Sequence, residues 1–276
     1  MVRITALMDN EPSEHQSLIH EHGLSYLIER EDCRILFDCG ASISPWQNAR
    51  RLGRSVHRLD AVVLSHSHYD HAAGFRDLIE LGNGSQLLYT GPGFFTPKFS
   101  FDGLLYTDIS AGFTADFLVA HDIRHKEVQG LAEIFPGIYL ISGFPRTHDF
   151  ETIPKRFVRQ TQAGFVPDDF SDEICMALEL EGKLVVLVGC SHPGILNMMQ
   201  HVRQVLGRPI YAVFGGTHLK EANDKRIALT IAQLQEMGLE LLGLSHCSGS
   251  AAECVAQQTP AVKSCHMSVG KCVFLA

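Results

Sequence analysis

Four short apolar runs in this 276-residue chain are each followed, within four residues, by a histidine. Runs of this length and composition are typical of central strands that are covered on both faces. Open α/β sheets place their ligands at the carboxyl ends of such strands. We therefore expect the histidines to mark a site at a sheet edge. The runs span 59–64, 184–188, 210–214 and 239–244, and the histidines are His66, His192, His218 and His246.

The pattern around these runs alternates between strands and helices in both halves of the chain. Residues 45–53 have Pro near the start and Gly at the end, the polarity expected of a short helix. Residues 221–237 carry Ile227, Ile231 and Leu234 at helical spacing. This alternation predicts sheets with helices packed outside them. Further strands are expected at 23–29, 33–38 and 174–180, and a further helix at 194–206.

Composition excludes several classes of protein. With 45% hydrophobic residues and a formal charge of −8, the chain is globular and has no basic footprint for nucleic acid or an anionic membrane. The first residues are too polar for a signal peptide, and no apolar stretch reaches the roughly 18 residues of a membrane span. We expect a soluble cytoplasmic protein whose eight cysteines are reduced, with neither nucleic acid nor membrane as a partner.

The chemistry is concentrated in one segment, because three of the 15 histidines fall within six residues. In extended backbone, His66 and His68 project to one side, whereas Asp70 and His71 lie on the turn into a helix and can face the same point. Imidazole and carboxylate suit Zn, Mn or Fe, and two ions about 3.5–4 Å apart could share a bridging hydroxide. We interpret the segment as a metal site.

Six residues cannot complete two metal sites, so other strand ends must supply ligands. We favour His192 and His246 as ligands over a purely structural role. For His218, a role beside the ligands or toward the substrate is as plausible as coordination. Cys190 could be a thiolate ligand, but a small buried cysteine is the preferred interpretation.

Other features carry weaker expectations. A cationic segment around His148, Lys155, Arg156 and Arg159 could hold a phosphate, although most such segments are solvated. Six of the 16 phenylalanines fall in residues 91–119, either as a flexible lid or as an insertion with its own minor core. The remaining histidines are expected to be solvated or hydrogen-bonded: His15, His20, His22, His57, His121, His125, His201 and His266.

These residues resemble the metallo-β-lactamase superfamily. Its His-x-His-x-Asp-His motif is matched in full by His66, His68, Asp70 and His71, and its upstream Asp-x-Gly motif is matched by residues 38–40. The resemblance implies an αββα sandwich with the metals at one edge between the two sheets. It also implies a single domain over residues 1–276, with the Phe-rich insertion at about 91–119.

A closer resemblance is to the branch named for 7,8-dihydropterin-6-methyl-4-(β-D-ribofuranosyl)aminobenzene 5′-phosphate synthase, and it covers nearly the whole chain. It implies that His66, His68 and His192 hold one metal, and that Asp70, His71 and His246 hold the other. The chain departs from the branch at Ala73, at Thr217 and at 143–146, positions expected to line the substrate pocket. Matching segments are 9–10, 21–25, 65–71, 145–146, 150–151, 172–173, 189–194, 215–216, 218–219 and 246–247.

The predicted function is that of a metal-dependent hydrolase acting on an ester or phosphoester-type small molecule through metal-bound hydroxide. The predicted cofactors are two divalent ions, with Zn preferred and Mn or Fe as alternatives. Asp70 is expected to be a metal ligand with an orienting role. His218 is expected to donate a hydrogen bond to the transition state. Alternatives are the pterin condensation of the synthase, with a phosphorylated or pterin-like substrate, a mononuclear-iron oxidoreductase, and a metal-binding module without catalysis.

Overall fold

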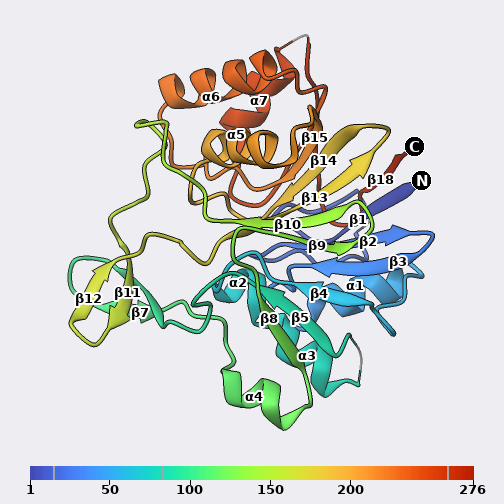
Figure 1. The fold of residues 1–276 in the computed structure, drawn as a ribbon, viewed down its shortest axis with the longest axis vertical. Coiled ribbons are helices and arrows are strands. Elements are labelled where there is room, and N and C mark those ends of the chain that lie inside the picture. The colour runs from blue at the N-terminus through green and yellow to red at the C-terminus, as the bar shows by residue number, and fades with distance from the viewer. Residues whose placement is uncertain (15, 83, 260) are drawn as a thin grey trace.

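Two seven-stranded sheets packed face to face form the body of the molecule (Figure 1). The computed structural model describes residues 1–14, 16–82, 84–259 and 261–276, so His15 lies outside the described residues. The first sheet combines the N-terminal part of the chain with the last strand. In spatial order its strands are β18 (Cys272–Leu275), β1 (Val2–Met8), β2 (Ser25–Arg30), β3 (Cys33–Phe37), β4 (Ala61–Val63), β5 (Leu87–Thr90) and β8 (Arg124–Glu127).

The second sheet holds the other three apolar runs of the sequence. Its strands β14 to β17 are parallel, with Val186 beside Val213 and Phe214 beside Gly243. The carboxyl ends of these strands therefore lie at the same edge of the sheet. In spatial order the strands are β17 (Lys263–His266), β16 (Leu241–Leu244), β15 (Ile210–Gly215), β14 (Lys183–Val188), β13 (Ile174–Leu180), β10 (Ile138–Ser142) and β9 (Leu131–Phe135).

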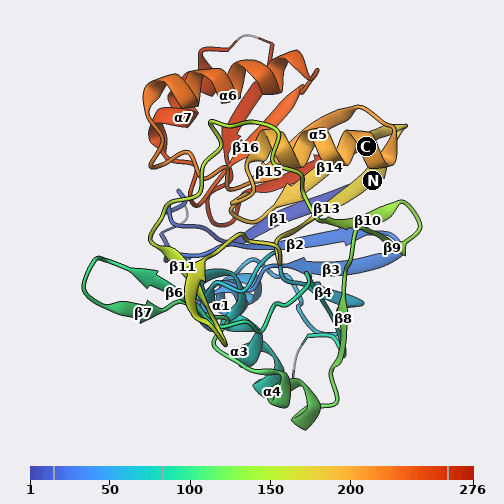
Figure 2. The ribbon, with the colours of Figure 1, turned by 60° about the vertical axis from the view of Figure 1, so that its left-hand side comes forward.

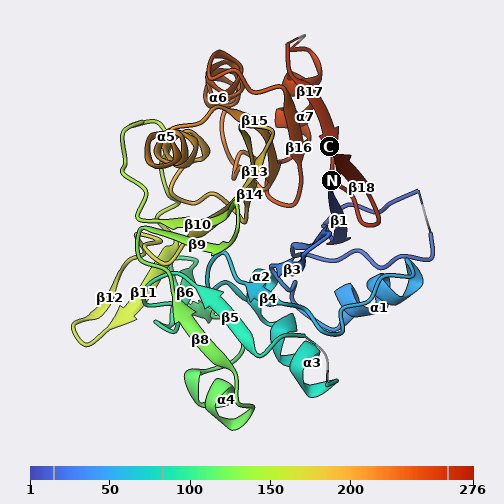
Figure 3. The same cartoon turned by 45° about the vertical axis from the view of Figure 1, so that its right-hand side comes forward.

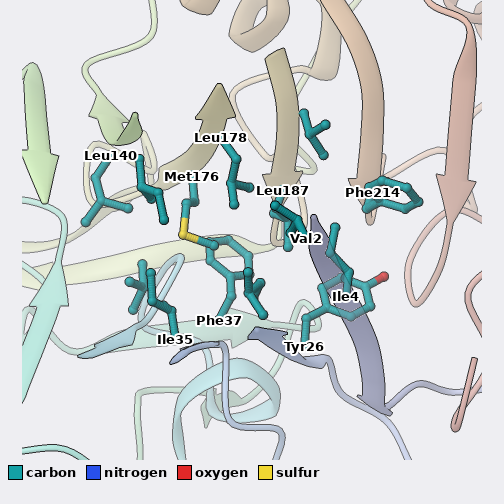
Figure 4. Close-up of a cluster of buried hydrophobic side chains, with 14 of the residues drawn as sticks. Val2, Ile4, Tyr26, Ile35, Phe37, Leu140, Met176, Leu178, Leu187 and Phe214 are labelled. Carbon is teal, nitrogen blue, oxygen red and sulfur yellow. The ribbon is translucent and has the colours of Figure 1, made fainter. Parts of the chain in front are cut away.

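The main core lies between the two sheets. Figure 4 shows side chains of the first sheet, such as Ile4 and Phe37, pointing toward Met176, Leu187 and Phe214 of the second. All five are fully buried. Burial of this apolar area holds the sheets together, at about 25 cal/mol for each Å² removed from water.

Helices cover the outer face of each sheet. Trp46 and Phe75 pack under the first sheet, and Leu196, Ile231 and Ala256 pack on the second. The order helix, sheet, sheet, helix confirms the predicted αββα sandwich (Figure 1). No helix among the described residues is long and apolar enough to span a bilayer. The first layer has α1 (Ser44–Arg51), α3 (Gly74–Glu80) and α4 (Ala115–Ala120), and the second has α5 (Ile195–Leu206), α6 (Asp224–Glu236) and α7 (Ser250–Gln257).

Beside the sandwich stands a four-stranded sheet made of two hairpins (Figure 2). The Phe-rich segment is divided between this sheet and the first helical layer. Phe94, which is fully buried, packs in the first helical layer with the partly buried Phe95, Phe113 and Phe117. Phe99 instead belongs to the small sheet. That sheet has the order β12 (Gly164–Pro167), β11 (Phe157–Thr161), β6 (Lys98–Phe101) and β7 (Tyr106–Asp108).

The fold brings both halves of the chain to one site. The histidine cluster follows β4, and the one-turn helix α2 (Tyr69–Ala72) begins inside it. The other three runs end at the carboxyl edge of β14, β15 and β16. Figure 3 shows α2 beside β4, and the Tyr69 amide at the start of α2 donates to the Ile109 carbonyl, which directly follows β7.

Candidate metal centre

Loops from both sheets bury the predicted ligands together at this edge. His66, His68, Asp70 and His71 come from the loop and turn after β4, whereas His192 and His246 follow β14 and β16. All six residues are at most 5% exposed. The structure therefore brings together every residue that the sequence analysis proposed as a ligand.

The first ligand set consists of His66, His68 and His192. One ring nitrogen from each lies within 4.8 Å of the others. The Nε2 atoms of His66 and His68, and both ring nitrogens of His192, are buried without a hydrogen-bond partner among the described residues. Burial holds the pKa of all three histidines well below the usual range, so they are neutral. A neutral imidazole with an unused lone pair is the form that binds a metal ion.

The second ligand set consists of Asp70, His71 and His246. The His71 and His246 Nε2 atoms are 3.2 Å apart, and Asp70 Oδ2 lies 3.7 Å from the first and 3.2 Å from the second. Tetrahedral bonds of about 2.0–2.1 Å to a zinc ion would separate its ligand atoms by about 3.3 Å. The three atoms are therefore already at the spacing that one divalent ion requires.

Hydrogen bonds fix which nitrogen of each ring faces this point. His71 Nδ1 donates to Asp38 Oδ2 at 2.7 Å, and His246 Nδ1 lies 2.9 Å from the Asn10 side-chain oxygen. Both Nε2 atoms then carry lone pairs, and two lone pairs 3.2 Å apart need a cation or a proton between them. Burial alone would lower the pKa of His71, but the Asp38 and Asp70 carboxylates raise it to about 9. The surroundings thus favour positive charge at this position.

Asp38 also orients the first set, through Ser65. The Ser65 hydroxyl donates to Asp38 Oδ2 at 2.8 Å, so its oxygen accepts from His66 Nδ1 at 2.9 Å. The Ser65 amide donates to Asp38 Oδ1 at 2.7 Å. One buried carboxylate therefore sets the tautomers of a histidine in each ligand set, a function typical of groups behind metal ligands.

His192 is held by two neighbours that the sequence analysis did not assign. Glu173 accepts from the backbone amides of Ser191 and His192 at 2.6 and 2.9 Å, and burial raises its pKa to about 8. The Phe170 ring stacks on the His192 imidazole at 3.8 Å between centroids. The Lys98 ammonium group lies over the same Phe170 ring, 4.3 Å from its centroid.

His22 is the residue whose role the sequence analysis missed. It was expected to be solvated or hydrogen-bonded, yet its Nε2 lies 3.1 Å from Asp70 Oδ2, within reach of a metal held by the second set. Its side chain is still 56% exposed. His22 lies in the segment 21–25, whose match to the synthase branch could have marked it as a site residue. Its contact with Asp70 could not be predicted from spacing, because the two residues are 48 positions apart in the sequence.

A cavity of about 280 Å³ opens onto both ligand sets. His218 lines it, with its ring 4.5 Å from that of His192, so it lies beside the first set. Burial lowers the pKa of His218 to about 4, which leaves the ring neutral near pH 7. Arg156, Lys220 and Phe157 also line the cavity.

Two expectations about the surroundings are corrected. Ala73 and Thr217 do not line the cavity, because Ala73 lies against Gly112 and the Thr217 hydroxyl donates to Ser248. In the cationic segment only Arg156 reaches the cavity; Arg159 pairs with Asp169, and His148 lies against Gln200 instead. Arg156 itself forms a two-bond pair with Glu221.

Comparisons with known proteins agree with this geometry. Residues 20–104 match the family model of the metallo-β-lactamase superfamily. The 7,8-dihydropterin-6-methyl-4-(β-D-ribofuranosyl)aminobenzene 5′-phosphate synthase of Methanocaldococcus jannaschii is 29% identical over 91% of this chain and 89% of its own length.

Solved structures extend the agreement over the whole chain. Tm1679, a metal-dependent hydrolase of the β-lactamase superfamily, superposes with a TM-score of 0.86 at 26% identity and full coverage of both chains. Zinc-bound PqqB of Methylobacterium extorquens shares the fold, with a TM-score of 0.59 at 14% identity over 99% of this chain and all of its own. The chain has the metallo-β-lactamase fold, which implies divalent metal binding, matches the superfamily's family model over residues 20–104, and resembles the dihydropterin synthase branch in sequence.

Proposed function

We propose that the chain is a hydrolase that uses two divalent metal ions, zinc by preference, on an ester or phosphoester-type small molecule. The observation that carries the proposal is a pair of three-ligand sets beside one cavity. The first set has buried ring nitrogens without a partner among the described residues, and the ligand atoms of the second lie 3.2–3.7 Å apart. His66, His68 and His192 would hold one ion, and Asp70, His71 and His246 the other. Ions bound there supply an activated water and stabilise negative charge on a carbonyl or phosphoryl oxygen.

The chain's own residues would position the substrate around these sets. Asp70 binds and orients, because its Oδ2 lies within hydrogen-bond distance of both His22 and His246. His218 is neutral near pH 7, so it would act as a hydrogen-bond donor to a developing oxyanion rather than as a charged acid. Phe157 lines the cavity and would give the substrate an apolar contact.

The cavity favours a small substrate with negative charge. Its volume of about 280 Å³ is at the lower limit of the roughly 300–1,000 Å³ typical of small-molecule pockets. Lys220 lines it and has no ion pair within the described part of the chain. An ammonium group of this kind suits a phosphate or carboxylate group. We therefore propose a small anionic substrate and neither nucleic acid nor membrane as a partner.

Metal content per chain is the first test. Protein purified without added metal is expected to contain close to two zinc or manganese ions, and the His66→Ala/His68→Ala variant fewer. Hydrolysis of an ester, thioester and phosphodiester panel should depend on those ions. Absence of metal even after reconstitution would refute the proposal, and one iron per chain with oxygen uptake on a thiol substrate would favour the oxidoreductase instead.

The similarity to the dihydropterin synthase over 91% of the chain favours a second candidate, a synthase-type condensation. In this reaction the amine of a ribofuranosyl-aminobenzene phosphate would displace pyrophosphate from a dihydropterin pyrophosphate, with the amine proton passing to solvent. Release of pyrophosphate only when both substrates are present would identify the synthase. Turnover of single substrates by water would identify the hydrolase.

A further inference from the structure

Two thiols lie beside the ligand sets, and the functions considered above give neither of them a role. Cys190 is almost fully buried, and its Sγ lies 3.2 Å from His71 Nε2. Cys247 is half-buried, and its Sγ accepts from the His218 amide at 3.3 Å. Both line the cavity.

Cys190 has neighbours in both ligand sets. Its sulfur forms one group with His66 and His71, and a second with His246 and Cys247, in which all potential ligand atoms lie within 4.8 Å of one another. His66 belongs to the first ligand set, whereas His71 and His246 belong to the second. The sulfur therefore lies between the two positions that metal ions would occupy.

The end of β15 explains why a thiol can occupy this place. This strand runs into Gly215 and Gly216, which present no side chain to the site. A Cβ on Gly216 would lie 2.5 Å from Cys247 Sγ and 3.5 Å from the Cys190 Cα. The absence of a side chain at Gly216 leaves room for the Cys247 sulfur and lets the backbone of Cys190 approach.

The hydrogen bonds around Cys190 also favour a ligand role. His71 donates from Nδ1 to Asp38, so its Nε2 is the ring atom that faces the Cys190 sulfur and is placed to bind a metal ion. A neutral thiol is only a weak hydrogen-bond partner for this nitrogen. A cation bound by both the nitrogen and a thiolate would satisfy both groups, and thiolate sulfur is a preferred zinc ligand.

We propose that Cys190 is a metal ligand whose thiolate sulfur bridges the two ions, an inference that rests on the proposed dinuclear site. On metal binding the S–H bond breaks, the proton passes to solvent, and sulfur lone pairs form one bond to each ion. No oxidant or reductant takes part. Cys247 remains a thiol beside the site.

X-ray absorption at the zinc edge of the wild-type protein tests the bridge without any mutation. We expect a sulfur shell at about 2.3 Å, beside nitrogen and oxygen at about 2.0–2.2 Å. With two zinc ions per chain, a bridging sulfur is seen by both ions and gives one sulfur per zinc. A terminal thiolate gives half a sulfur per zinc and would overturn the bridge.

Elemental analysis of the same sample separates the two proposals. Two ions per chain without a sulfur shell would overturn the role of Cys190 while leaving the dinuclear site in place. A metal-free chain after reconstitution would overturn both. One sulfur per zinc with two ions supports both.

Cobalt substitution identifies the thiol. The Co(II) protein should show a near-ultraviolet sulfur-to-cobalt charge-transfer band that is lost in Cys190→Ser and kept in the matched variant Cys247→Ser. Loss of the band only in Cys247→Ser would overturn the assignment. If Cys190→Ser does not fold, the comparison of wild type with Cys247→Ser still decides, because a band that needs Cys247 cannot come from Cys190 alone.

Discussion

Replacing Asp38 with Asn tests whether one buried carboxylate sets the tautomers of the ligand histidines. The change keeps the shape of the side chain, and Asn tolerates the positive φ of 58° at this position. The Asp38 carboxylate accepts three hydrogen bonds, two from Ser65 and one from His71. An amide has only one acceptor oxygen, so its NH₂ group must face at least one of these donors.

The expected consequence is a change of tautomer at His71. If the amide donates to His71 Nδ1, the ring proton moves to Nε2, which faces the second ligand set and can then no longer bind metal. Loss of a group that orients a metal ligand typically reduces metal affinity about 10–100-fold. At about 1.4 kcal/mol for each factor of ten, this corresponds to about 1.4–2.8 kcal/mol.

Competition against a chromophoric chelator would measure this loss for each ion. Asp38→Asn should weaken the binding of the ion at the second ligand set by that factor. Ser65→Ala should weaken the binding of the ion at the first set more than that at the second, because Ser65 connects Asp38 to His66. Asp60→Asn is the matched control, since Asp60 is exposed and its carboxylate accepts from the Arg34 amide away from the site. If Asp38→Asn bound both ions with the affinities of the wild-type protein, the tautomer argument would be refuted.

Three further predictions concern catalysis, pH and stability. His218→Ala should lower kcat about 10²–10³-fold in steady-state assays, as expected when one donor to an oxyanion is lost. Burial alone would lower the pKa of His266, but hydrogen bonds and charge from Asp9 and Glu253 raise it to about 10. The pKa of His266 in the unfolded chain is about 6.5, so this stabilisation is complete below pH 6.5 and is lost as pH rises through about 10. The difference in melting temperature between wild type and His266→Gln should therefore shrink between these two pH values. Lys98→Met should cost about 3–5 kcal/mol in urea unfolding, because it leaves two buried carboxylates without their cation.

The sequence predicted the strands that position the site because their apolar runs are continuous. The run at 59–64 corresponds to β4, which is shorter at 61–63, and the runs before His192, His218 and His246 correspond to β14, β15 and β16. A strand that is buried on both faces appears in the sequence as an unbroken run of apolar residues. The positions of these runs were sufficient to predict that the histidines lie at the carboxyl ends of strands.

Contacts made by residues on loops cannot be predicted in the same way. His22 reaches Asp70 through the tertiary fold, and the pairing of Cys190 with His71 spans 119 positions. No period or spacing encodes these contacts, because the loops that carry them have no regular side-chain pattern. The same limit explains why Ala73 and Thr217 were expected at the cavity, where the structure does not place them.

The ligands are positioned by the protein rather than by a metal. Asp38 holds the loop after β4, Glu173 holds the His192 backbone, and Asp9 accepts from the His246 amide at 2.6 Å. All three carboxylates are buried and belong to segments other than those they hold. These hydrogen bonds join protein groups only, so we expect them to form without an ion and to leave little ordering of the loops for a metal to drive. Small zinc domains that unfold without metal behave differently, since in them metal binding supplies the folding free energy. In this chain, we expect the folding free energy to come from the hydrophobic clusters that pack the helices on the two sheets. The spacing of the ligand atoms would then be a property of the sandwich itself.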